Sequence, residues 1–211
     1  MHFELGRLSV GWSIIPRIMT ATTRMETGAP AWSIRLAFEL SGNDQSAQTV
    51  AGGLNDEQMN WQPAAGKWSV GQCLGHLCIT NDAYMKAIAE AIEGKPDSPV
   101  EQITPGWISK WFIRSFIEPS PQSKRATAPS KMRPGARVDV GVLDRFLAGN
   151  RACRELVLQA REKNVNQIRF RNPLASVIRF TVGTGLEIIA GHERRHLLQA
   201  ERVRDAAEFP G

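Results

Sequence analysis

Near its C-terminus the sequence reads Gly191-His192-Glu193-Arg194-Arg195-His196-Leu197-Leu198-Gln199, and the interpretation of the whole chain starts from this segment. His192 and His196 are four residues apart, so on a helix they share one face and lie about one turn (~6 Å) apart along the axis. Two imidazoles at this spacing can bind one metal ion. The alternative is a pair of solvated histidines among charged neighbours, and the spacing alone leaves both open.

The same segment has the form His-Glu-x-x-His, in which zinc peptidases use the Glu as general base. Gln199 and Arg202 stand where the extended peptidase motif has a Gly and a third His. Glu193 follows His192 by one residue, about 100° around the helix, which predicts that it points away from a bound metal. The sequence therefore disfavours a peptidase.

A third ligand is available in His76, in a helix expected from residue 69 to 94. Ser69 and Gln72 form a capping box at its start, and Gly94 suits a helix end. If this helix faces the last one, three imidazoles meet and leave one coordination position open, as in catalytic metal sites. A histidine packed in the core is the alternative for His76.

The chain has 211 residues, which suits a single core. Its pattern shows no alternating strands and no internal repeat. Long helices are expected over residues 31–53, 69–94 and 139–163, and from either Asn172 or Gly185 to Ala206. We therefore predict an all-α fold, an up-down four-helix bundle of antiparallel helices with a decorated crossover between the second and third.

The first 28 residues lack periodicity, so residues 1–28 are expected to be a poorly structured N-terminal extension or a mis-assigned start, with Met25 as the alternative start. Residues 29–211 then form the bundle domain. His2 falls in this extension and is not counted as a ligand.

Composition excludes several classes of protein. Hydrophobic residues make up 42% of the chain and charged residues 22%, which argues against a wholly disordered chain. No apolar run has the length of a membrane span, so no stable membrane insertion is expected. Three cysteines are too few for a disulfide framework and favour a cytoplasmic location. The net charge of +5 resides in residues 106–137, which carry seven cations and one acid, and without a recognised motif it does not indicate nucleic acid.

The basic region contains the aromatic segment Trp107–Ile117, expected to be a short helix. Its apolar residues surround the helix, which favours burial, either in the core or as a cover over the metal pocket. A dimer contact and an interfacial membrane helix are the alternatives.

Several shorter pieces occur in a fixed order along the chain. They are Trp61-x-Pro63, Lys67-Trp68-Ser69-Val70, Gly75-His76-Leu77 and the segment 191–199. In this order they resemble the DinB-like superfamily (DinB/YfiT-type metalloenzymes) over about Ala31 to Glu208. The resemblance implies a four-helix bundle in which His76, His192 and His196 bind a divalent metal, with zinc first and nickel or iron as alternatives.

Relatives include bacillithiol S-transferases and mycothiol-dependent maleylpyruvate isomerases, so the resemblance implies a small-molecule substrate and a low-molecular-weight thiol as co-substrate. The expected activity is a thiol-dependent S-transferase or hydrolase. A homodimer is compatible with it, since dimers are common among similar proteins. The alternative is a non-catalytic bundle that serves as a binding or interaction module.

Gln199, Cys73 and Tyr84 have two interpretations each. Tyr84, two turns after His76, either reaches the metal pocket or packs in the core, with packing favoured. Gln199 is either a partner of a ligand or polar surface, and Cys73, one turn before His76, is either a ligand or core, with core favoured. Trp61 and Trp68 are expected to pack their loop against the bundle.

Overall fold

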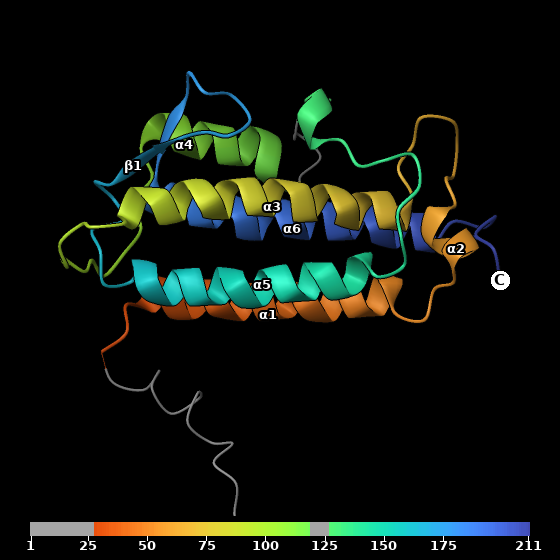
Figure 1. Cartoon of the computed structure of the whole chain (residues 1–211), viewed down its shortest axis with the longest axis horizontal. Helices are drawn as coiled ribbons and strands as arrows, with labels where there is room; N and C mark the ends of the chain where they lie inside the picture. Colours follow the sequence, from red (N-terminus) through yellow and green to blue (C-terminus); the bar gives the residue numbers. More distant parts are fainter. Residues whose placement is uncertain (1–27, 119–126) are drawn as a thin grey trace, which may run out of the picture.

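The computed structural model describes residues 28–118 and 127–211. Long helices lying side by side form its frame (Figure 1): α1 (Ala31–Ala51), α3 (Val70–Ile92), α5 (Val142–Ala160) and α6 (Val182–Arg204). Helices α1 and α3 each pack against both α5 and α6. The all-α prediction is confirmed. Apart from Gly28, the expected N-terminal extension lies outside the described residues.

The crossover between α3 and α5 determines the direction of the helices. Just beyond the C-terminal ends of these two helices, the Ser98 N–H donates to the Glu162 carbonyl, and the Lys163 ammonium donates to the Lys95 carbonyl. The two helices therefore end at the same side of the molecule and run parallel, while α1 and α6 run the other way (Figure 1). The decorated crossover is thus as expected, but α3 and α5 are not antiparallel, because the crossover returns the chain to the side where α3 began.

Local signals explain where α3 starts and stops. The Ser69 hydroxyl accepts the Gln72 N–H, and the Gln72 side chain accepts the Ser69 N–H, so the expected capping box is formed. At the other end, Gly94 adopts a φ of 64°, in the left-handed region that glycine tolerates best. The capping box is preceded by a loop that holds the short helix α2 (Asp56–Asn60).

The chain before α6 differs from the expectation. Strands β1 (Arg169–Arg171) and β2 (Arg179–Thr181) form an antiparallel hairpin, and α6 begins at Val182 with the Thr181 hydroxyl as its N-cap. Asn172, expected as a possible start of the helix, instead accepts the Leu174 N–H within the hairpin loop. The strands are three residues long, which is too short to produce a visible alternation in the sequence.

The aromatic segment is divided between solvent and core. It forms α4 (Trp107–Phe112) and the π-helix η2 (Ile113–Ile117), and a 3₁₀ turn, η3 (Ser130–Met132), follows later in the crossover. Ile117 is buried, but Trp107 is 81% and Ile108 53% exposed, so the expected burial is wrong for the first turn of α4. No helix in the described parts of the chain is long and apolar enough to cross a membrane.

A polar layer crosses the middle of the helical core. The fully buried Glu193 carboxyl on α6 accepts one N–H from an asparagine on each of the other three long helices, Asn43, Asn81 and Asn150. This layer separates two apolar clusters. One contains Leu40, Tyr84, Cys153 and Ile189, and the other contains Ala47, Leu77, Phe146 and Leu197. Helix α1 is continuous through the Gly42-Asn43-Asp44 stretch, and Asn43 faces this layer from it.

Close packing at one glycine of α6 predicts a stability difference. A Cβ at Gly185 would lie 2.6 Å from the Phe170 ring, whereas a Cβ at Gly42, inside α1, would meet nothing within 4 Å. We expect Gly185→Ala to lower the free energy of unfolding by about 1–3 kcal/mol through overpacking. Gly42→Ala should raise it by about 0.5–1 kcal/mol. Chemical denaturation of both variants checks this, and equal effects would contradict the packing described.

Candidate metal centre

The structure brings together the three histidines singled out in the sequence. His76 comes from the first half of α3. His192 and His196 come from the middle of α6 and the turn after it, and α6 runs antiparallel beside α3. One ring nitrogen from each lies within 4.8 Å of the other two. The ring centroids are 4.6 Å apart for His192–His196, 4.7 Å for His76–His196 and 5.1 Å for His76–His192. The three nitrogens are therefore close enough together to hold one metal ion.

Two of the rings are oriented by hydrogen bonds to Nδ1. His76 Nδ1 lies 2.7 Å from the Met132 carbonyl oxygen, and His196 Nδ1 lies 3.1 Å from the Gln199 side-chain oxygen. Because both partners are acceptors, Nδ1 carries the proton and Nε2 presents a lone pair. Metal-binding histidines are commonly held this way. Gln199 is thus the partner of His196.

The three histidines are uncharged at neutral pH, which is the protonation state in which imidazole binds a metal ion. Burial lowers the pKa of all three histidines, and for His196 the pKa falls to about 3. The neighbouring imidazoles and the Arg195 guanidinium lower the pKa of His192 and His196 further. At neutral pH all three rings are therefore uncharged, so a metal ion does not have to displace protons.

Trp68 is a site residue that the sequence interpretation missed. Its ring stacks on His196, with centroids 5.6 Å apart and an interplanar angle of 28°, and it also lies 4.8 Å from the ring of His76. Trp68 was expected to pack its loop, and it does border the core, but it also forms one wall of the histidine cluster. In the sequence, Trp68 stands directly before the Ser69 cap and two turns from His76, and this position could have indicated that it lies near the histidines. Trp61 packs against Phe209 instead.

Other candidates lie elsewhere. Cys73 is buried in the apolar core, and burial raises the pKa of its thiol to about 12, so the core interpretation is the better one. The Tyr84 hydroxyl donates to Asn172, away from the histidines. Glu193 faces the polar layer and its asparagines, in agreement with the expected 100° offset from His192, which leaves the peptidase hypothesis without a base.

The two described ends of the basic crossover flank the histidines. Ile117 occupies the space next to Gly191, where a Cβ would approach its side chain to 2.8 Å. The next residue, Glu118, accepts a hydrogen bond from Arg195 through its carbonyl (3.4 Å). On the other side, η3 supplies the Met132 carbonyl to His76. The crossover is therefore part of the wall of the site, and glycine at 191 permits the close approach.

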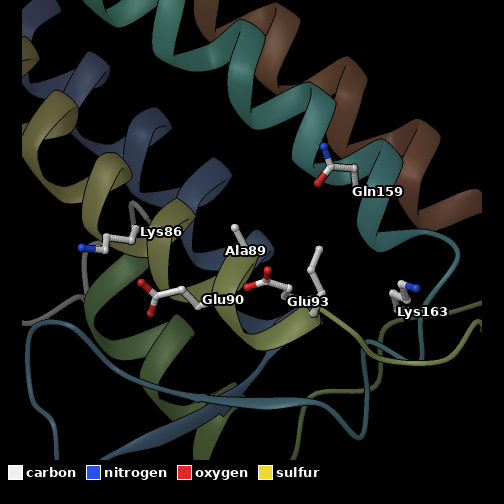
Figure 2. A pocket seen from close by; sticks show the side chains of 7 residues that line it. Lys86, Ala89, Glu90, Glu93, Gln159 and Lys163 are labelled. Atoms are coloured by element: carbon white, nitrogen blue, oxygen red, sulfur yellow. The ribbon is translucent and has the colours of Figure 1, made fainter.

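An open hollow of about 410 Å³ lies at the opposite end of α3 (Figure 2). It is lined by Lys86, Glu90 and Glu93 near the end of α3, and by Gln159 and Lys163 near the end of α5. These charges are of mixed sign, and His76, around which the other two histidines gather, lies in the first half of α3. The hollow is thus separate from the candidate metal centre.

Comparison with known proteins gives two matches. The family model described as the DinB superfamily matches residues 39–200, which include all three histidines. A Bacillus subtilis (strain 168) protein with the name "Uncharacterized protein YuaE" is 24% identical over 163 residues, covering 74% of this chain and 89% of that protein. No solved structure matches.

Proposed function

The chain belongs to the DinB superfamily, and from this membership and its histidine cluster we propose that it is a metal-dependent enzyme acting on a small molecule. The observation that carries the proposal is the convergence of His76, His192 and His196 on one point. As the reaction we propose a thiol-dependent S-transfer or a hydrolysis. We place this chemistry in the cytosol, since the three cysteines are unpaired and buried.

The donor set fits a divalent transition metal. Three neutral imidazole nitrogens suit zinc first, with nickel and iron as alternatives. Among the described residues the group contains no fourth ligand, so one position is left for substrate or water. An ion held there supplies Lewis acidity, which lowers the pKa of a thiol or a water molecule towards neutrality.

The residues of the chain supply orientation and exclusion of water. The Met132 carbonyl and the Gln199 side chain hold two imidazoles with Nε2 directed at the cluster. Trp68 stacks on His196 and keeps water from one side of it. Both effects favour a fixed, partly dry site, in which electrostatic interactions with a substrate are stronger than in water.

Activity of the reconstituted protein tests the proposal. Protein loaded separately with Zn²⁺, Ni²⁺ or Fe²⁺ is assayed for conjugation of small thiols to an aryl halide and for hydrolysis of aryl esters. We expect at least one metal form to act about 100-fold faster than metal-free protein, within the range of positioned acid–base and Lewis-acid catalysis. His76→Ala should lose this rate, because it removes one of the three ligands.

A non-catalytic interaction module is the second candidate, and the exposed Trp107 and Ile108 favour it. It requires that metal loading leave both assays at background. It also requires that Trp107→Ser abolish association with a partner while His76→Ala does not. Rates that depend on the metal and on His76 would rule out this candidate.

A further inference from the structure

The outer side of α4 carries both apolar and basic side chains. Trp107 is 81% and Ile108 53% exposed, although large apolar side chains usually pack inside a protein. Lys110 follows Trp107 by three residues, Arg114 follows Lys110 by four, and both cations are exposed. Residues at these spacings share one side of a helix. The outward side of this helical segment therefore combines cations with apolar surface that burial against a partner would stabilise.

The β1–β2 hairpin packs beside α4 and extends this surface. The rings of Phe112 on α4 and Phe180 on β2 have centroids 5.1 Å apart, and Figure 1 shows α4 and β1 on the same side of α3. Arg171 and Arg179 are directly opposite each other in the hairpin, and both are exposed. Like charges at paired positions repel, so a bound anion would stabilise them. In the loop between the strands, Val177 is 93% exposed.

No acidic residue balances the charge of this surface. A third segment joins it, because the Lys131 ammonium donates to the Pro173 carbonyl in the hairpin loop. Residues 106–117, 127–134 and 164–181 contain no acid and seven cations, which are Lys110, Arg114, Lys131, Arg133, Arg169, Arg171 and Arg179. In the part of the chain that the structure describes, none of the seven forms an ion pair. We call these cations, together with Trp107, Ile108 and Val177, the basic-apolar face.

We propose that the basic-apolar face docks the protein on the surface of a phospholipid bilayer that contains anionic lipids. Tryptophan side chains favour the boundary between headgroups and acyl chains, and cations close to an anionic bilayer strengthen binding to it. The docking is peripheral and requires no membrane-spanning helix. The inference concerns a surface other than the histidine cluster and is independent of the proposed enzymatic function.

Two other occupants fit this surface less well. A nucleic acid would match the seven cations and could stack a base on Trp107, but the exposed aliphatic side chains of Ile108 and Val177 neither stack on bases nor bind phosphates. A second copy in a two-fold symmetric dimer would place the same seven cations against each other. A bilayer with anionic headgroups above apolar chains meets both the charge and the apolar side chains.

Sedimentation with vesicles tests the proposal. The untagged full chain is mixed with vesicles of phosphatidylcholine alone, or of phosphatidylcholine with about one-third phosphatidylglycerol. We expect binding to the anionic vesicles to be at least about 10-fold stronger than to the neutral ones. The binding should weaken at about 1 M salt, where the Debye length falls to about 3 Å. Equal binding to both kinds of vesicle, or binding to neither, would overturn the proposal.

Charge variants assign the preference for anionic lipid to the hairpin. Arg179→Gln should weaken binding to the anionic vesicles about fivefold, and Arg171→Gln/Arg179→Gln about 30-fold, because each cation near such a surface contributes about fivefold. The matched control is Arg151→Gln, which changes an exposed arginine on α5. Helix α5 lies on the opposite side of α3 from α4, so this variant should bind as the unaltered chain does (Figure 1). Equal losses in Arg179→Gln and Arg151→Gln would contradict the assigned surface.

Apolar variants test the second half of the surface. Trp107→Ser and Val177→Ser should each weaken binding to the anionic vesicles about fivefold to 10-fold, because each removes an apolar side chain that enters the bilayer. Val177 lies in a loop, so its variant keeps the test open if Trp107→Ser disturbs α4. Phe38→Ser is the control, since Phe38 is 79% exposed but lies on α1, away from α4 (Figure 1). Binding that is unchanged in both Trp107→Ser and Val177→Ser would contradict the proposal.

Two further readouts separate the bilayer from other occupants. Lipids with brominated acyl chains quench tryptophan fluorescence on contact, and Trp107→Phe should bind the vesicles but show less quenching. Unchanged quenching in this variant would contradict the docking of α4. Binding to a single-stranded oligonucleotide without binding to anionic vesicles would assign the face to nucleic acid and overturn the proposal. A dimer seen by light scattering and lost in Trp107→Ser would assign it to a second copy, with the same consequence.

Discussion

The His192→Ala/His196→Ala double variant is expected to contain no divalent metal, whereas the unaltered chain should contain close to one ion per chain. The variant removes two of the three nitrogens that converge in the cluster and leaves His76 alone. Binding to structural zinc sites is worth about 10–16 kcal/mol, spread over a small number of ligands, so one remaining imidazole cannot hold the ion. Elemental mass spectrometry of untagged protein, purified without added metal, measures the content.

Two controls separate ligand loss from unfolding. His2→Ala changes the remaining histidine of the chain and should keep the metal. Circular dichroism of the double variant should retain the helical signal, because both rings are only half-buried. Metal that persists in the double variant would contradict the assignment of ligands. An unaltered protein that refuses added zinc would contradict the site itself.

Gln199 provides a graded test of the same centre. Its side chain orients His196 through the Nδ1 hydrogen bond and donates no ligand itself. Loss of such a partner typically lowers metal affinity about 10-fold to 100-fold. In the same series Gln199→Ala should therefore bind the ion more weakly than the unaltered chain and more tightly than the double variant.

The parts of this site that were predictable from sequence depend on neighbours along the chain. The four-residue interval between His192 and His196 defines a helix face, and the Ser69–Gln72 capping box defines where the helix of His76 begins. Both features follow from helix geometry and survive any packing arrangement. Predicting that His76 meets His192 and His196 also required knowing that their two helices face each other, and this information came from the family resemblance.

The parts that were missed depend on packing between segments distant in the sequence. Trp68 contacts His196 only because α6 lies against the start of α3. Asn172 had the local signal of a helix start, but it closes a hairpin loop because the adjacent strands pair. The parallel direction of α3 and α5 follows from the path of the crossover, and no residue pattern within the two helices records it.

The largest stability effect is expected at Glu193, the acceptor at the centre of the polar layer. Glu193→Ala leaves the buried amides of Asn43, Asn81 and Asn150 without their carboxylate partner. A buried polar group left without its partner costs about 1–3 kcal/mol, so the loss of three such hydrogen bonds is expected to cost about 3–5 kcal/mol. A matched control is Glu187→Ala on the same helix, where the partly exposed carboxylate pairs with Arg35. Its cost should be below about 1 kcal/mol, and chemical denaturation of both variants measures the difference.

Glu193→Gln adds a dependence on pH with a defined sign. The ordinary pKa of a glutamate carboxyl is 4.5, and burial raises that of Glu193 to about 8, although the hydrogen bonds from the three asparagines lower it. Between these values the folded state holds a proton that the unfolded state releases, so this group stabilises the fold fully below pH 4.5 and less as pH rises through 8. The unfolding free energy of the unaltered chain should therefore fall relative to that of Glu193→Gln over this interval. A difference that is constant with pH would contradict the raised pKa.

The position of Glu193 connects this stability effect to the metal centre. Glu193 directly follows His192, and its bonds to three helices fix the rotation of α6 within the core. The layer also separates the two apolar clusters, whose side chains have no directional preference of their own. Without it, we expect small shifts of α6 to cost less, and such shifts move His192 and His196 out of alignment with His76. We therefore expect Glu193→Ala to weaken metal binding although it removes no ligand, whereas Glu187→Ala should leave metal affinity unchanged.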